Sequence, residues 1–374
     1  MTRAIRRSVS TIAMTVTLAL GAFALPTAAA GARQLEVNVS PSAWTASARI
    51  LVGHFQDISA VVDSHGRVHV AATTPTGDLW YATDRTGSWT KRRVLKHTST
   101  YINWWPSIAL DEHDRVHIAF ERLPNEVGDL GVWYITDTGR ARGTFPTNAT
   151  RIAPPGNGEP VLKVSDGHLY LVVDKGWCCL GAGTLQLRTN VSGHWTVSTI
   201  GPGMEPSFRL GSDHRARVAY TTDSPRGLWY AVASSPTGGF TRQQIATATD
   251  PADTTVDSLP ILALNGSNQP RIVWSHLQDV RYAWRDAAGW HTPVNVASNQ
   301  PQDQRVGFDT DTQGRPTVAV GGANLKVRVL SGGTWHVSTI ASAHDVNAIV
   351  VRRAMGGHSV VAWTDSTGVW ISRN

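Results

Sequence analysis

The sequence predicts an all-β fold, a single seven-bladed β-propeller. A pattern of four short apolar runs, separated by turns rich in Gly, Asp and Asn, recurs along the chain in seven copies. The aromatic residues of successive fourth runs are 45 to 56 residues apart. Four strands in about 40 to 50 residues form one propeller blade. The seventh copy ends without a fourth run, and an unmatched run of that type stands near the N-terminus, at residues 43–50.

The N-terminal residues have the pattern of an export signal. Three arginines lie within residues 1–7, an apolar stretch follows over residues 12–25, and residues 28–30 (AAA) form the small-residue motif that signal peptidase accepts. No second apolar run approaches the roughly 18 residues that a membrane span needs. We therefore expect a secreted, extracellular protein. The predicted organisation is a signal peptide at 1–30, a linker at 31–40 and one propeller at 41–374.

Composition excludes several other classes. The formal net charge is +6, of which the signal segment supplies three, and no basic stripe or arm suggests nucleic acid. The two cysteines are neighbours, so neither a zinc site nor a disulfide framework can be built from them. The histidines show no ligand spacing, and no phosphate-binding or dinucleotide motif is present. We expect a monomer with no cofactor and no dedicated metal site.

The repeat is clearest in its second and third runs, where each copy has β-branched or aromatic residues typical of strands. The second runs are VHV (68–70), VHI (116–118), LYL (169–171), RVAY (217–220), RIVW (271–274), TVAV (317–320) and VVAW (360–363). The third runs are LWY (79–81), VWY (132–134), LQL (185–187), LWY (228–230), VRY (280–282), LKV (325–327) and VWI (369–371).

The ends of the chain indicate how the ring closes. The segment 43–50 (AWTASARI) matches the fourth run at 334–340 (TWHVSTI), and Trp44 precedes Trp89 by 45 residues. We therefore expect the N-terminal strand to complete the last blade. This arrangement would leave no open sheet edge at the seam.

The turn before the fourth run resembles the Asp-box, or BNR, repeat of sialidase-like propellers, Ser-x-Asp-x-Gly-x-Thr-Trp. Residues 83–89 (TDRTGSW) keep the spacing from Asp to Trp, whereas 331–335 (SGGTW) and 192–195 (SGHW) keep only Gly and Trp. In that family the box is a folding element away from the active site. The chain lacks the Arg-Ile-Pro motif of the six-bladed sialidases, so no catalytic residue is carried over. Similar seven-bladed proteins include lectins and polysaccharide lyases, which implies a glycan partner.

Propeller geometry places the loops that enter the innermost strands around one axial opening. The residues just before these strands are acidic in five of the seven copies, and we call these five the acidic collar. Such a ring would raise some carboxyl pKa values or favour a bound cation, and paired carboxylates also serve glycoside hydrolysis. Alternatively, the acids only cap loop ends. The collar consists of Asp57, Glu159, Glu205, Asp303 and Asp345, with Trp105 and Leu259 in the other two copies.

Two further features fall on the same face. Trp104 and Trp105 can stack on sugar rings or simply plug the channel as core. Trp177, Cys178 and Cys179 lie between the second and third runs of the third copy. In an oxidising compartment the two cysteines can close a strained vicinal disulfide at a ligand site, or remain free thiols in an ordinary loop.

Three functions are consistent with these features. The first is a secreted, lectin-like protein that binds a glycan or polysaccharide at one axial site. The second is a sialidase-like glycosidase or a polysaccharide lyase, with Glu159 and Glu205 as its acids. The third is a protein-interaction scaffold. The irregular residues are concentrated in copies two to four, which favours one axial site over several equivalent ones.

Overall fold

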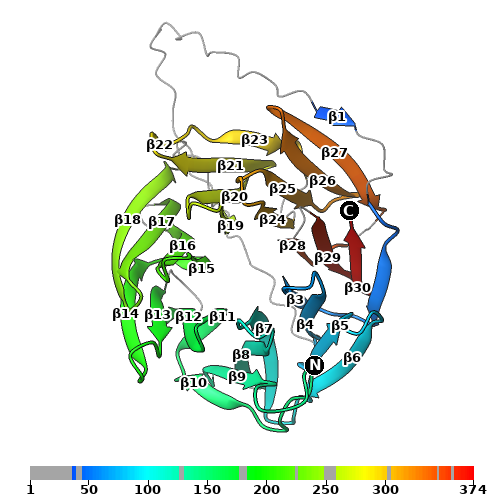
Figure 1. Cartoon of the computed structure of the whole chain (residues 1–374), viewed down its shortest axis with the longest axis vertical. Helices are drawn as coiled ribbons and strands as arrows, with labels where there is room; N and C mark the ends of the chain where they lie inside the picture. Colours follow the sequence, from blue (N-terminus) through cyan, green and yellow to red (C-terminus); the bar gives the residue numbers. More distant parts are fainter. Residues whose placement is uncertain are drawn as a thin grey trace, which may run out of the picture. The chain divides into compact units, whose positions relative to one another are not determined.

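The computed structural model describes a ring of seven antiparallel sheets built only from strands, and it confirms the predicted seven-bladed propeller (Figure 1). All described residues belong to one compact unit, Gln34–Asn374. In the described part of the chain no helix has the length and apolarity of a membrane span. The structure describes residues 36–38, 44–125, 130–176, 183–223, 226–247, 258–300, 305–342, 345–354 and 358–374.

The first four blades each have four strands in sequence order from the axis outward. Blade one contains β3 (Asp57–Val62), β4 (Val68–Thr73), β5 (Leu79–Thr83) and β6 (Thr90–Leu95), and blade two contains β7 (Tyr101–Leu110), β8 (Val116–Pro124), β9 (Val132–Thr136) and β10 (Thr150–Ala153). Blade three contains β11 (Asn157–Ser165), β12 (His168–Lys175), β13 (Thr184–Thr189) and β14 (Thr196–Pro202), and blade four contains β15 (Met204–Leu210), β16 (Ala216–Asp223), β17 (Arg226–Ser235) and β18 (Gly238–Thr247).

The outer strands of blades five and six depart from the simple pattern. In blade five the outer strand is split into two pieces that both pair with β21, and in blade six an extra strand, β1, runs parallel to β27. The extra strand lies within the stretch interpreted as a linker. Blade five contains β19 (Ser258–Leu264), β20 (Pro270–His276), β21 (Asp279–Asp286), β22 (Gly289–Trp290) and β23 (Val294–Ala297), and blade six contains β24 (Val306–Thr310), β25 (Pro316–Val320), β26 (Leu325–Ser331), β27 (Thr334–Ala341) and β1 (Glu36–Asn38).

The seventh blade is completed by the N-terminal strand, as the sequence predicts. It contains β28 (Ala348–Arg353), β29 (Ser359–Asp365), β30 (Gly368–Arg373) and β2 (Ala48–Val52). Strand β2 pairs antiparallel with β30, and Thr45 donates its backbone N–H to the carbonyl of Arg373. The strand itself begins and ends slightly later than the predicted residues 43–50.

The core lies between blades, because each sheet covers the face of its neighbour. One cluster, for example, joins Ile50 and Val369 of blade seven to Val70 of blade one, with Trp80 packed against it. Innermost strands are also tied together by serines: Ser59, Ser107 and Ser207 each accept a backbone N–H from the next blade, at 3.2, 2.9 and 2.9 Å. The second strands, such as β4 and β20, are buried on both sides, whereas β6 is largely exposed.

The recurring turn acids have structural roles. Asp84, in the Asp-box-like stretch, accepts the backbone N–H of Val68 at 2.7 Å and so ties the third strand of blade one to its second. Asp137 and Asn190 make the same bond in blades two and three, each at 2.8 Å. In the first turn of a blade, Asp63 likewise accepts two backbone N–H groups, from His65 and Arg67. These side chains hold the turns in shape.

Candidate functional site

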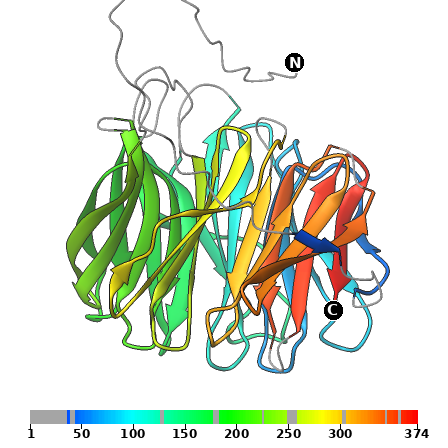
Figure 2. The same cartoon turned by 90° about the horizontal axis from the view of Figure 1, so that it is seen from above.

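The collar residues occupy one end of the innermost strands, which run between the two faces of the ring (Figure 2). Five residues at this position, three of the collar and the two non-acidic ones, have a left-handed backbone with φ between 44° and 59°. Four of them precede a proline and lie in a β-bulge of the innermost strand. A non-glycine residue in this conformation costs about 1 kcal/mol or more. The five residues are Trp105, Glu159, Glu205, Leu259 and Asp345.

The structure corrects where the innermost strands begin. The sequence predicts Trp105, Glu159 and Glu205 just before these strands, yet β7, β11 and β15 start earlier and contain them. The bulge is the physical reason, because it interrupts the alternation of buried and exposed residues that marks a strand in sequence. The backbone of these residues therefore belongs to the sheet and not to a free loop.

Asp57 and the two tryptophans form the most distinctive group on this face. The rings of Trp104 and Trp105 lie 5.7 Å apart at 41°, and both side chains are half-buried. The Oδ2 of Asp57 and the Nε1 of Trp104 are buried without a hydrogen bond of normal geometry. Burial raises the pKa of Asp57 to about 6, although the Trp104 indole and the charge of Arg305 oppose this. The group thus joins aromatic surface to a carboxyl group that faces the Trp104 indole.

The two glutamates have different surroundings. Glu205 accepts the backbone N–H of Leu259, in the bulge of the next blade, at 2.9 Å. The backbone N–H of Glu159 is itself bound, at 3.0 Å, by Glu121 of the preceding blade. In both cases a carboxylate of the preceding blade binds a backbone N–H that the bulge has taken out of the sheet hydrogen bonding. For Glu205 this supports the interpretation that the acid caps the backbone. No described hydrogen bond or ion pair joins Glu159 to Glu205.

The remaining predicted site residues are peripheral or undescribed. Asp345 is exposed. Asp303, Trp177, Cys178 and Cys179 lie outside the described residues, and the disulfide stays a prediction.

Asp174 is a buried acid whose importance the sequence analysis missed. It lies in β12 opposite Gly158 and is fully buried, and neither of its carboxylate oxygens has a hydrogen-bond partner among the described residues. Burial raises its pKa to about 7. Its position equals that of Thr73 and Glu121 in the second strands of blades one and two. Most of the seven copies have a neutral residue at this position, so an acid there is the sequence feature that could have identified Asp174.

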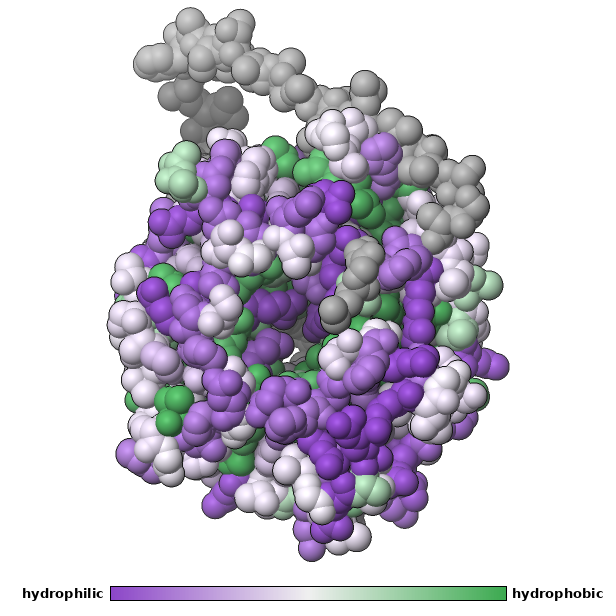
Figure 3. Space-filling model, in the orientation of Figure 1, coloured by the Kyte–Doolittle hydropathy of each residue, from purple (hydrophilic) through white to green (hydrophobic). Residues whose placement is uncertain are grey.

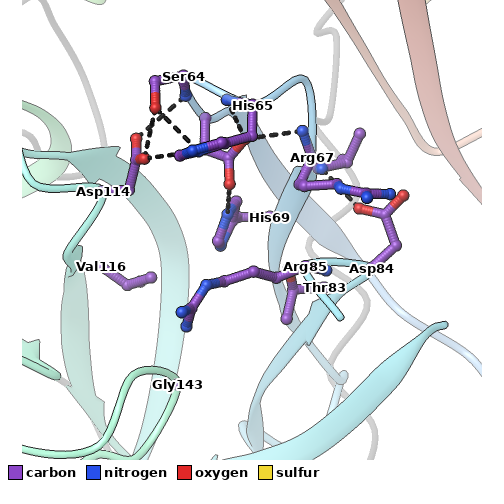
Figure 4. A network of polar contacts seen from close by, with 12 residues as sticks. Ser64, His65, Arg67, His69, Thr83, Asp84, Arg85, Asp114, Val116 and Gly143 are labelled. Carbon is purple, nitrogen blue, oxygen red and sulfur yellow. Dashed lines mark hydrogen bonds and ion pairs between the residues drawn. The ribbon is translucent and has the colours of Figure 1, made fainter. Parts of the chain in front are cut away.

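The turns of blades one and two interlock through polar side chains (Figure 4). Asp114 accepts both the backbone N–H and the hydroxyl of Ser64, at 3.1 and 2.6 Å, and lies 3.3 Å from His65. Asp63, His65 and Asp114 are close enough to share a metal ion. However, Asp63 already accepts the backbone N–H of His65 and pairs with His69. We therefore interpret the cluster as a structural contact between the turns of blades one and two.

His69 and His117 occupy equivalent positions of blades one and two and have equivalent contacts. Each is buried and pairs through Nδ1 with a tyrosine hydroxyl at 2.6 Å, Tyr81 and Tyr134 respectively. Burial lowers the pKa of both imidazoles in spite of neighbouring aspartates. Neutral histidines in two copies of one motif favour packing over catalysis.

A cavity of about 250 Å³ opens between blades one and two. Arg85, Lys91, Arg92 and Arg142 line it, and in Figure 4 Arg85 extends toward Gly143 at its edge. None of the described residues that line this cavity is acidic. It is a second place on the described surface where a ligand can fit.

No protein-family model and no curated protein matches the chain. Among solved structures it is similar to a lectin from Burkholderia pseudomallei, with 15% identity, a TM-score of 0.59, and 85% of this chain and 96% of the lectin covered. It is also similar to an ulvan lyase from a new family of polysaccharide lyases (13% identity, TM-score 0.56, 86% and 94% covered). A third is YCF48 bound to a D1 peptide (13%, 0.55, 91% and 97%). At these identities the likeness establishes the propeller fold alone.

Proposed function

We propose that this protein is a secreted, lectin-like propeller that binds a carbohydrate at one axial site. The observation that carries the proposal is the group formed by Asp57, Trp104 and Trp105. Flat aromatic surface packs against the apolar faces of sugar rings, and the Asp57 carboxyl group beside it can accept a hydroxyl group. The export-signal pattern and the lectin and ulvan lyase among similar folds support the proposal.

A glycosidase or polysaccharide lyase is the second candidate. A carboxyl group with a pKa of about 6, as at Asp57, can donate or accept a proton near neutral pH. Glu159 and Glu205 are the other acids that such a reaction could use. Cleavage of a bound glycan, measured by product release, would favour this candidate over a lectin.

The test is binding of the mature protein to a glycan array. We expect Asp57→Asn and Trp104→Ala to weaken binding about tenfold or more, because each removes a direct contact. Trp195→Ala is the control, since Trp195 is an exposed tryptophan of blade three outside the axial group. Every glycan that binds is then tested for cleavage by the wild type and by a Glu159→Gln, Glu205→Gln double variant.

Failure to bind any glycan would overturn the proposal. A protein-interaction scaffold would then be the better account, a role for which the peptide-bound YCF48 gives a precedent in the same fold. Binding that Trp195→Ala weakens as much as Trp104→Ala would also contradict an axial site.

A further inference from the structure

Four charged side chains stand at one equivalent position of the innermost strands. Lys163, Arg209, Asp309 and Arg352 pair with Tyr170, Arg217, Thr317 and Val360, which are equivalent residues of the second strands. The same position holds Val61, Ala109 and Ala263 in blades one, two and five. We call the four charged residues the channel cluster.

The channel cluster lies at the opposite end of the axis from the collar. Lys163 follows Glu159 by four residues along β11, which is roughly 13 Å of strand. Each member stands near the end of its innermost strand, whereas the collar residues stand near the beginning. The centre of the ring is hollowed, with hydrophilic residues along part of its rim (Figure 3).

The cluster is cationic and its charges act on one another across the axis. Arg209 and Asp309, from blades four and six, approach to 3.9 Å. Arg352 is fixed by bonds from Nε to the Ala60 carbonyl at 2.7 Å and from an Nη to the Val351 carbonyl at 2.8 Å. One acid thus faces three cations. Burial, with the charges of Arg209 and Arg352, lowers the pKa of Lys163 well below its usual value.

The side-chain amine of Lys163 has no hydrogen bond or ion pair with any described residue. Asp309 does not compensate for it, because this carboxylate already faces Arg209 and accepts the backbone N–H of Arg353 at 3.1 Å. Lys163 is half-buried as a residue, and burial of its amine is the first cause of the lowered pKa. The protonated form of this amine is unfavourable beside two guanidinium groups, and a bound anion would offset their repulsion and restore the proton.

We propose that the channel cluster binds a tetrahedral oxyanion, sulfate or phosphate, between Lys163, Arg209 and Arg352. Guanidinium groups present paired donors that suit such oxygens, and a lysine adds a point charge. Asp309 holds Arg209 in place and disfavours a ligand of higher charge. The anion can be a free ion or the terminal ester of a larger molecule. This site is independent of the proposed glycan site at the other end of the axis.

Isothermal titration calorimetry at constant ionic strength tests the proposal with sodium sulfate and sodium phosphate as probes. We expect one equivalent to bind the wild type, Lys163→Met to weaken affinity roughly tenfold or more, and Lys163→Arg to restore most of it. Lys96→Met, at an exposed lysine of the loop after β6, is the control. Arg209→Gln provides a second variant with the same expected loss.

Equal affinity in the wild type and in Lys163→Met, or no binding at all, would overturn the proposal. Glucose 6-sulfate and glucose 6-phosphate then separate the two sources of the anion. Binding as tight as that of the inorganic ion indicates a terminal ester, and binding of the inorganic ion alone indicates a free ion. Because these probes act through Lys163, and the axial glycan test acts through Asp57 and Trp104, failure of one does not imply failure of the other.

Discussion

At the scale of single residues, burial raises the pKa of two carboxyl groups. Asp174 lies inside blade three, and Asp57 lies at the axial mouth beside Trp104. Burial in a medium of low polarity favours the neutral form of an acid, and no cation stands close enough to reverse that effect. Each of these residues therefore links the stability of the fold to pH.

Replacing Asp174 by Asn should remove a pH-dependent loss of stability. Because the folded pKa of about 7 exceeds the ordinary 3.8, the contribution of the neutral acid is present in full below pH 3.8 and is lost as pH rises through 7. At pH 8 the ionised acid costs the fold up to about 4 kcal/mol. We expect Asp174→Asn to raise the free energy of unfolding in urea at pH 8 by a few kcal/mol, and by less at pH 5.

The control for this prediction is Glu112→Gln, at an exposed carboxylate in the β7–β8 turn. It should leave stability nearly unchanged at both pH values. A gain from Asp174→Asn that is equal at pH 5 and pH 8 would show that the carboxyl group does not titrate in the expected range.

At the scale of elements, the bulges of the innermost strands decide how the collar residues point. Sequence alignment of the copies identified equivalent positions, because the four-strand pattern repeats. It could not predict the bulge, because the extra residue interrupts the alternation by which a strand is identified in sequence. Nor could it predict that Glu205 binds the amide of Leu259, a contact 54 positions away in sequence. The short strand β1 was missed because three residues carry too little periodicity.

Loss of the Glu205 carboxylate should therefore destabilise the seam between blades four and five. Glu205→Ala leaves the Leu259 amide without its acceptor, and an unsatisfied, partly buried amide costs about 1–3 kcal/mol. Glu205→Gln keeps an acceptor oxygen and should cost less. Urea denaturation of both variants, with Glu112→Ala as the exposed control, measures the difference. If Glu205→Ala is as stable as the wild type, the hydrogen bond to Leu259 does not support the fold.

At the scale of the whole molecule, the ring depends on one strand from the far end of the sequence. The closure could be predicted because the orphan run at residues 43–50 matches a fourth strand and the last copy lacks one. Strand β2 covers the edge of β30, which would otherwise expose unpaired backbone groups. The channel cluster could not be predicted in this way. Its four residues are far apart in the sequence, and only the closed ring brings blades three, four, six and seven together around one axis.

Removing β2 should open the ring. A protein that starts at residue 53 loses the whole outer strand of blade seven, so we expect a lower melting temperature and association through β30 in size-exclusion chromatography. A protein that starts at residue 44 keeps β2 and should behave as a monomer of nearly full stability. Equal melting temperatures for the two proteins would mean that β2 does not close the ring in solution.

Carbohydrate binding beside Asp57, Trp104 and Trp105 can be seen in a crystal structure of the mature protein with a glycan identified on the array. We expect a sugar ring packed against Trp104 or Trp105, with a hydroxyl group bound to Asp57. A glycan seated instead between blades one and two, in the cavity lined by Arg85 and Arg142, would contradict it.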